Sequence, residues 1–485
     1  MEAEKQDVLQ VDQSQTDLRE AAQLEIDHAA EKKLVRKVDR FVVPVVMIAY
    51  LLCFLDRVNI GNARLYGLEE DLNMSSAQYQ AAVAVLFVTY VLVEVPSNLI
   101  LKHFRPSRYI AFLAVSWGIV STLTGVVQSY GGLIACRLLL GLMEGGLLPG
   151  LTVYLTMFYT KKELALRIGY LFVSSALAGA CGGLLAYGIG FMDGVAGQSG
   201  WRWVFIIEGI PTTLYGFAIW LLLADSPSTA WYLTPDERHL LVARLHRQPG
   251  FHEELLRKDS IAAFKDWKTW LFAAGQFTVN SMLYSYSIFL PTIIKGLGHW
   301  SSTQAQALTV PVYASGAISY LLVARLSDAH QLRGPYQIGA ACTCMIGYGL
   351  LIARVGPAVH YFATFVIALG LFIAVGIPLA WLPSNNPRYG KRTAATGVQI
   401  AVCNTSGILA PFLYPATDGP HYTMGFSVSI GLLGFGSFLY GFASLYLHRV
   451  NKRRMEGKED HKVAGMTDYE IDALGDESPR FVYTF

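Results

Sequence analysis

Long apolar stretches recur along almost the whole chain, and they limit what it can fold into. Twelve stretches of roughly 18 to 25 residues are each long enough, as a helix rising 1.5 Å per residue, to cross a hydrocarbon core of about 30 Å. They lie near residues 41–62, 77–101, 109–128, 131–158, 166–190, 202–224, 269–294, 305–324, 336–353, 360–382, 394–416 and 424–447. The pattern predicts an all-α membrane protein with twelve transmembrane helices.

The composition supports this class. Of the 485 residues, 53% are hydrophobic and 15% are charged, whereas a soluble domain is usually about a quarter charged. The first forty residues are polar and contain no apolar core, so we expect no cleavable signal peptide and a first span that directs insertion itself. All six cysteines lie inside predicted spans, which argues against a disulfide framework.

The distribution of basic residues predicts the orientation in the membrane. With the N-terminus in the cytosol, all but six of the 38 Lys and Arg residues fall in cytosolic segments, as the positive-inside rule requires. The six exceptions are Arg57, Arg64, Arg137, Arg202, Lys295 and Arg354. We therefore expect a multi-pass protein with both termini in the cytosol.

A charged segment with three prolines, residues 225–268, divides the spans into six and six. The expected organisation is a cytosolic tail (1–40), a six-helix half (41–224), a cytosolic linker (225–268), a second six-helix half (269–448) and a cytosolic tail (449–485). Within the linker, Thr234 followed by Pro235 is typical of a helix start, and it predicts a short surface helix.

Two loops at corresponding places in the halves are related. The loop after span 8 reads ARLSDAHQLRGP, in which Arg325, Asp328 and Arg333 resemble the short basic loop motif of major facilitator transporters. The loop after span 2, LKHFRPSR, carries the motif in degenerate form. We expect these three charges to serve in gating or structure. The resemblance implies a major facilitator fold, in which two halves rock about a central site.

Charged residues inside the spans are the strongest functional signal. A charge at the bilayer centre costs about 2.5 to 3.5 kcal/mol on insertion scales, so such residues normally face a cavity or one another. They all belong to the first half and are Asp56, Arg57, Glu94, Arg137, Glu144 and Glu208. By these boundaries, spans 7 to 12 have no charged residue in their interiors.

The chemistry of these charges suggests a substrate. The rise per residue places Asp56 and Arg137 at similar depth, with Glu144 two turns after Arg137 on the same face. Buried arginines suit a carboxylate, because the guanidinium fork donates to both of its oxygens and keeps its own charge. Asp56 and Glu144 could exchange protons as access changes between the two sides. The alternative is that these charges form ion pairs that only hold helices together.

Two further acids in the spans have more structural interpretations. Glu94 lies nearer the cytosolic end of span 2, where a gating or loop-anchoring salt bridge is favoured over substrate contact. Glu208 in span 6 is interpreted as structural.

Several motifs together resemble one family. The chain is similar to the fungal allantoate permease group, within the anion:cation symporter family of the major facilitator superfamily, over about residues 40–448. The motifs are FLDRVNIGNA, RLLLGLMEGGLLPG, GWRWVFIIEG, FLPTIIKGLG and NTSGILAPFLYP. The resemblance implies uptake of organic anions with protons. It also implies proton linkage at Asp56 and Glu144, substrate contact by Arg57, and Arg137 as the arginine of the span 4 motif.

The neutral second half is expected to complete the pocket. Asn280 and Tyr284 are four residues apart in span 7, and Gln399 and Asn404 are five apart in span 11. These four side chains could select among carboxylates by hydrogen bonding, or could equally be packing contacts between helices.

The sequence as a whole predicts a monomeric proton symporter that imports a small organic carboxylate, with the plasma membrane as the expected location. Export of an acidic metabolite and a nutrient receptor that no longer transports are the alternatives. The glycine-rich span 5 lacks the strand and the GK[ST] sequence of a phosphate-binding loop. We expect no catalysis of a covalent reaction, no metal or cofactor, and no nucleic-acid partner.

Overall fold

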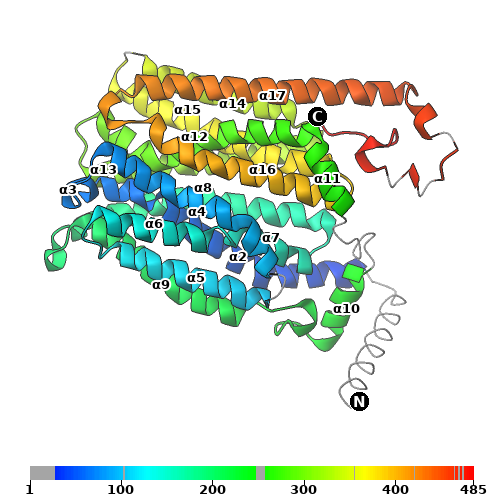
Figure 1. Cartoon of the computed structure of the whole chain (residues 1–485), viewed down its shortest axis with the longest axis horizontal. Coiled ribbons are helices and arrows are strands. Elements are labelled where there is room, and N and C mark those ends of the chain that lie inside the picture. Colours follow the sequence, from blue (N-terminus) through cyan, green and yellow to red (C-terminus); the bar gives the residue numbers. More distant parts are fainter. Residues whose placement is uncertain are drawn as a thin grey trace.

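A computed structural model describes residues 28–101, 104–246, 257–353, 355–419, 421–463, 465–467, 470–471 and 474–485. Within these ranges every regular element is a helix, and each of the twelve predicted spans is helical (Figure 1). The first half contains α2 (His28–Arg64), α4 (Ser76–Leu101), α5 (Pro106–Thr124), α6 (Tyr130–Glu144), α7 (Leu147–Phe158), α8 (Lys161–Ile189) and α9 (Gly200–Leu222). The second half contains α12 (Trp267–Leu297), α13 (Ser302–His330), α14 (Gly334–Ile352), α15 (Pro357–Ser384), α16 (Tyr389–Leu409) and α17 (Thr423–Met455).

Three shorter helices mark the two ends of the bundle. Helix α3 (Leu68–Asp71) lies at one end, which we call the α3 end. Helices α10 (Pro235–His246) and α11 (Arg257–Lys265) lie at the opposite end, which we call the linker end, and the last residues of the chain lie there too (Figure 1). The predicted linker helix is therefore present as α10, and it begins at the expected proline.

Ten helical segments among the described residues are long and apolar enough to cross a membrane, with α6 and α7 counted as one segment. Helices α5 and α12 are not among them. Helix α12 carries polar side chains that are fully buried in the protein, including Gln276, Ser281 and Ser285. A spanning helix tolerates such residues when they face the bundle rather than lipid.

The fourth predicted span is interrupted where it meets α4. Helix α6 ends at Glu144, and α7 begins after the pair Gly145 and Gly146. A Cβ on Gly145 would lie 2.5 Å from the carbonyl oxygen of Tyr90, and one on Gly146 would lie 2.0 Å from the hydroxyl of Ser97. The two glycines thus let α4 approach closely, and Glu144 is the last residue before the break.

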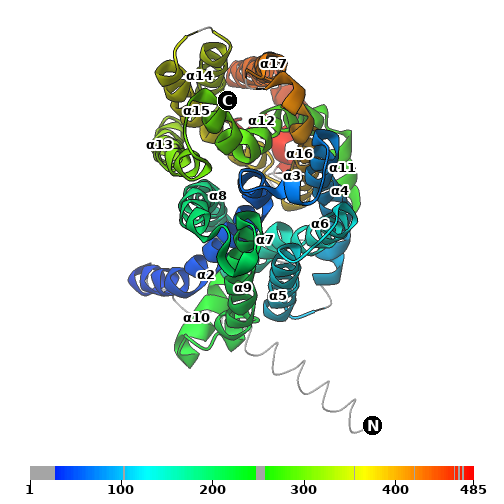
Figure 2. The same cartoon turned by 90° about the vertical axis from the view of Figure 1, so that its left-hand side faces the viewer.

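The two halves meet along three helix pairs, α2 with α12, α4 with α16, and α8 with α13 (Figure 2). At the α3 end this contact is tight, because a Cβ on Gly61 of α2 would lie 2.1 Å from the carbonyl oxygen of Ile288 in α12. The Ser302 hydroxyl at the start of α13 also donates a 2.9 Å hydrogen bond to the Leu65 carbonyl. The halves are therefore closed against each other at the α3 end.

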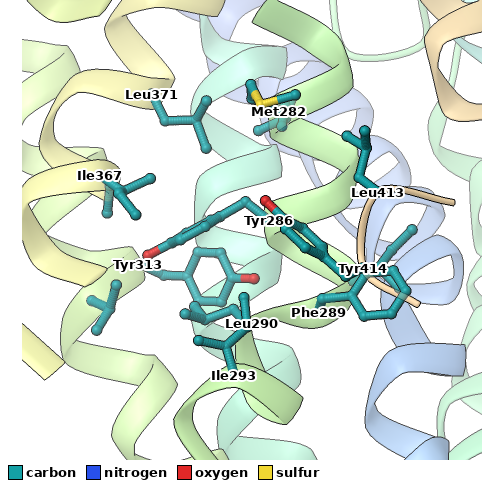
Figure 3. Close-up of a cluster of buried hydrophobic side chains, with 14 of the residues drawn as sticks. Met282, Tyr286, Phe289, Leu290, Ile293, Tyr313, Ile367, Leu371, Leu413 and Tyr414 are labelled. Carbon is teal, nitrogen blue, oxygen red and sulfur yellow. The ribbon is translucent and has the colours of Figure 1, made fainter. Parts of the chain in front are cut away.

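An apolar cluster fills the second half behind this contact. Side chains of α12 point toward those of α13, α15 and the segment after α16 (Figure 3). Tyr286 and Tyr313, although buried, donate their hydroxyl protons to the backbone carbonyls of Thr364 and Ser287. Each ring thus contributes apolar area without leaving an unsatisfied polar group.

Residues 474–485, which we call the C-terminal strap, fold back against the linker end of the second half. Asp476 accepts from the ammonium groups of Lys268 in α12 (2.7 Å) and Lys391 in α16 (2.9 and 3.0 Å). Burial alone would raise the pKa of Asp476, but these two cations outweigh it and hold the pKa below its usual value. Tyr483 exchanges two backbone hydrogen bonds with the side chain of Asn451 in α17 (2.8 and 2.9 Å).

Backbone carbonyls complete the strap. The Trp381 indole of α15 donates to the carbonyl of Thr484 (2.8 Å), and the amide of Arg333, just before α14, donates to that of Phe485 (2.9 Å). Together with the contacts of Asp476 and Tyr483, these bonds join the linker ends of five helices of the second half.

The close approach at Gly61 generates a prediction. Gly61→Ala is expected to hold α2 away from α12 and to open the α3 end, because the new Cβ collides with backbone rather than with a flexible side chain. The measurement is labelling of an Ile288→Cys reporter by a water-soluble maleimide, followed by peptide mass spectrometry. Labelling should rise several-fold. Gly339→Ala in α14 is the control, since nothing lies within 4 Å of its Cβ position, and equal labelling in both variants would contradict the assignment.

The strap generates a second prediction. Asp476→Ala should lower the free energy of unfolding by about 1.5 to 3 kcal/mol, because it removes one of the two carboxylates, Asp476 and Asp266, that pair with the ammonium groups of Lys268 and Lys391. The melting temperature of the purified protein measures this. Since the pKa of Asp476 is lowered on folding, its stabilisation is present at neutral pH and is lost as the pH falls through that pKa. The neighbouring exposed residue supplies the control Glu477→Ala, which should melt like the parent.

Candidate functional site

A central cavity lies between the two halves. Its walls come from α2, α4, α7 and α8 of the first half and from α12, α15 and α16 of the second. The polar lining residues are Tyr50, Arg57, Tyr90, Ser175, Asn280, Tyr284, Cys403 and Asn404. The free volume is about 30 Å³, which is room for a few water molecules at most. An organic ligand therefore requires the halves to separate.

Arg57 is the charged group of this cavity. Its side chain is 3% exposed, and its Nε and Nη2 atoms each lie 3.3 Å from Oε2 of Glu144, which is fully buried. Nη1 donates to the Tyr284 hydroxyl at 3.4 Å, and the ring of Tyr90 lies 4.7 Å from the guanidinium carbon. The cation thus has one anion in its own half, one hydroxyl in the other half and one aromatic face.

A chain of hydrogen bonds continues from Arg57 through the second half and back to the first. The Tyr284 hydroxyl donates to Oδ1 of Asn404 (3.1 Å), and Nδ2 of Asn404 donates to Oε2 of Glu94 (3.1 Å). The order is α2, α12, α16 and α4, so the chain crosses between the halves twice. The partner of Glu94 in this chain of bonds is a neutral amide of the opposite half. The gating role of Glu94 stays a prediction.

Asp56 does not pair with its neighbour Arg57. Its carboxylate instead accepts from the Trp117 indole (3.0 Å) and the Ser121 hydroxyl (2.7 Å), both on α5. Adjacent residues of a helix point about 100° apart, so one of them faces the cavity and the other faces the interior of the first half. The buried ion pair is therefore Arg57 with Glu144, and it joins two different helices.

Arg137 lies outside the cavity lining, against the ring of Phe205 at 5.4 Å. It is 1% exposed, and no described residue hydrogen-bonds to its Nε or Nη2. Asn59 donates to Glu208 at 2.5 Å, while the second oxygens of Glu208 and Glu144 have no partner in the described part of the chain. The first half therefore holds a buried polar cluster that is incompletely satisfied, whereas Arg57 is well coordinated.

The neutral residues predicted for the second half divide into two groups. Asn280, Tyr284 and Asn404 line the cavity. Asn280 is held by the Cys403 carbonyl and the Ser406 hydroxyl, both at 3.1 Å. Gln399 does not reach the cavity, and its amide donates to the Pro378 carbonyl at 3.2 Å. Its position, five residues before Asn404, turns its side chain toward α15.

The three loop charges lie far from the cavity, at the linker end of α13 and α14. Asp328 and Arg333 form a salt bridge of 2.6 Å, and Arg333 also contacts the Ser327 hydroxyl at 3.2 Å. Arg325 lies exposed on α13. None of the three lines the cavity, and their structural or gating role stays a prediction.

Several aromatic residues of the cavity escaped the sequence reasoning. Tyr50 and Phe54 lie seven and three residues before Arg57, so they share its helical face and could have been found by spacing. Tyr90 carries no such signal, because its ring reaches Arg57 from another helix. The rings of Tyr50, Phe54 and Tyr90 thus share one cavity with the guanidinium of Arg57.

Known transporters are similar to this chain in sequence. Residues 46–411 match the family described as the Major Facilitator Superfamily. An uncharacterized transporter of Schizosaccharomyces pombe is 40% identical over 474 residues, which covers 96% of this chain and 93% of the relative. The high-affinity nicotinic acid transporter of Saccharomyces cerevisiae is 30% identical, with 94% and 86% covered.

The fold is also shared with solved structures. A bacterial homolog of the human lysosomal transporter Spinster, in an inward-facing and unoccupied conformation, superposes with a TM-score of 0.66 at 16% identity, covering 84% of this chain and 96% of that one. At this identity the likeness concerns the fold alone.

The pairing in the cavity generates a prediction that a double-mutant cycle measures. Arg57→Gln and Glu144→Gln should each lower the free energy of unfolding, because each leaves a buried charge unpaired, and the double variant should recover part of the loss. The control is the cycle of Arg57→Gln with Asp476→Ala, an acid of the C-terminal strap that shares no partner with Arg57. That cycle should be additive within about 0.5 kcal/mol. The assignment is wrong if the two cycles give the same coupling.

Proposed function

Since this chain belongs to the Major Facilitator Superfamily of membrane transporters, we propose that it is a proton symporter importing a small organic carboxylate by alternating access. The observation that carries the proposal is Arg57, a cation fixed in the cavity between the halves and contacted by side chains of both halves. The relative named as a nicotinic acid transporter supports a carboxylate as the class of substrate. We place the chain in the allantoate permease group on the motifs described above.

The proposed mechanism is an exchange of anions on Arg57. The substrate carboxylate replaces Glu144 at the guanidinium of Arg57, and Glu144 binds a proton. Arg57 is therefore paired with one anion both before and after the exchange. Tyr284 and Asn404 donate hydrogen bonds to the edges of the carboxylate, and Asn280 shapes the wall beside them.

Asp56 acts at a distance in this scheme. Its contacts are Trp117 and Ser121 of α5, so protonation there alters how α2 packs on α5 rather than the ligand itself. Arg137 provides a second positive charge to the buried cluster of the first half, and Gln399 supports the packing of α16 on α15. We propose the plasma membrane as the location, with both termini in the cytosol and a single chain as the working unit.

The direction of transport follows the proton gradient in this proposal. Export of an acidic metabolite uses the same residues, and a receptor that binds without transport would keep the cavity alone. Neither alternative predicts that an acid is imported faster when the external pH is low.

The decisive test is uptake of labelled nicotinate, pantothenate, biotin, allantoate and a dipeptide by cells expressing the full chain, at pH 5 and pH 7.5, with and without a protonophore. Accumulation of one acid should be faster at pH 5 and abolished by the protonophore. Glu144→Gln should bind that acid but lose the dependence of accumulation on the gradient. Absence of uptake at either pH, with the protein at the cell surface, would refute the proposal and favour an exporter or a receptor.

A further inference from the structure

We propose that Glu94 is a specificity-determining residue, which makes the cavity select monocarboxylates carrying a positive or hydrogen-bond-donating group about one ring's width from the carboxylate, and reject dicarboxylates. The inference rests on the proposed function, because it takes Arg57 as the anchor of the substrate carboxylate. It gives the site a second charged group, the carboxylate of Glu94. The sequence alone favours a gate or a loop anchor at this residue.

The position of Glu94 relative to Arg57 follows from helix geometry. Tyr90 stacks against the Arg57 guanidinium at 4.7 Å, and Glu94 lies four residues later on α4, on the same face of the helix. Four residues advance a helix by roughly 6 Å, which is close to the width of a substituted six-membered ring. Arg57 thus lines the cavity, and Glu94 lies one helical turn from Tyr90, behind the lining residue Asn404.

The contacts of Glu94 tie it to the cavity wall. It is 5% exposed, and its Oε2 atom accepts from Asn404, which itself lines the cavity and accepts from Tyr284. Arg57 pairs with Glu144 rather than with Glu94. The acid is therefore held by a neutral amide, and a donor on the ligand could share or replace that amide at the carboxylate.

Electrostatics at this distance discriminate between ligands. A second carboxylate placed near Glu94 meets a like charge in a water-poor cavity, whereas an ammonium, pyridinium or N–H group meets a complementary one. The rings of Tyr50, Phe54 and Tyr90 line the cavity together with Arg57 and match a flat ligand body. Glu94 thus attracts a ligand that carries a positive or N–H group and repels one that carries a second carboxylate, and both effects contribute to the selectivity.

The test compares ligands built on one ring. Benzoate, 3-aminobenzoate, 1-methylpyridinium-3-carboxylate and benzene-1,3-dicarboxylate compete with the labelled acid that the uptake panel identifies, in cells expressing the full chain. The amine and the pyridinium should compete at least about tenfold more strongly than the dicarboxylate, as expected for one buried like-charge contact.

Variants separate selectivity from structure. In Glu94→Gln, which keeps the size and an acceptor oxygen, that ratio should collapse to within about threefold, because the charge is gone. Glu94→Asp keeps the charge and should keep the preference. Glu208→Gln removes another buried acid, one that contacts Asn59 rather than a residue of the cavity lining, and should leave the ratio unchanged.

Three results would overturn the inference. One is equal competition by the dicarboxylate and the amine in the parent. Another is an unchanged ratio in Glu94→Gln with all ligands weakened alike, which would make Glu94 a structural link between the halves. If the parent takes up no carboxylate at all, the proposed function itself fails, and this inference fails with it. Uptake without discrimination refutes the role of Glu94 alone.

Discussion

A guanidinium buried in the middle of a helix bundle has to find its partners within the protein, since neither lipid nor bulk water can supply them. Arg57 does so by drawing on Glu144, Tyr284 and the ring of Tyr90. These partners come from three other helices, and one of them belongs to the opposite half. The arrangement of α2, α4, α6 and α12 around Arg57 therefore satisfies this one charge.

The two halves divide the chemistry of the site. Charged side chains of the cavity and its surroundings come from the first half, while the second half contributes amides and hydroxyls such as Asn280, Tyr284 and Asn404. Neutral groups cost less to bury and can exchange partners with little penalty. In the proposed symport, the half that carries the charges would respond to protons, while the second half would read the shape and hydrogen-bonding pattern of the ligand.

Much of this arrangement could be predicted from the sequence, because hydropathy and helical spacing are local properties. The structure has helices at all twelve predicted spans and a linker helix that begins at Pro235, and it places Arg57, Tyr284 and Asn404 in the lining of one cavity. The partners of each charge could not be predicted, since they depend on how helices rotate against one another. Asp56 turned to α5, and Gln399 turned to α15. Glu94 met an amide from the opposite half rather than a loop cation.

The C-terminal strap has a consequence for how the protein is made. The residues that join the linker ends of five helices follow all of these helices in the chain, and they include the carbonyl of Phe485. Every helix of the second half is therefore synthesised before the segment that ties those ends together. A chain cut before residue 474 would contain all its spans yet lack this tie.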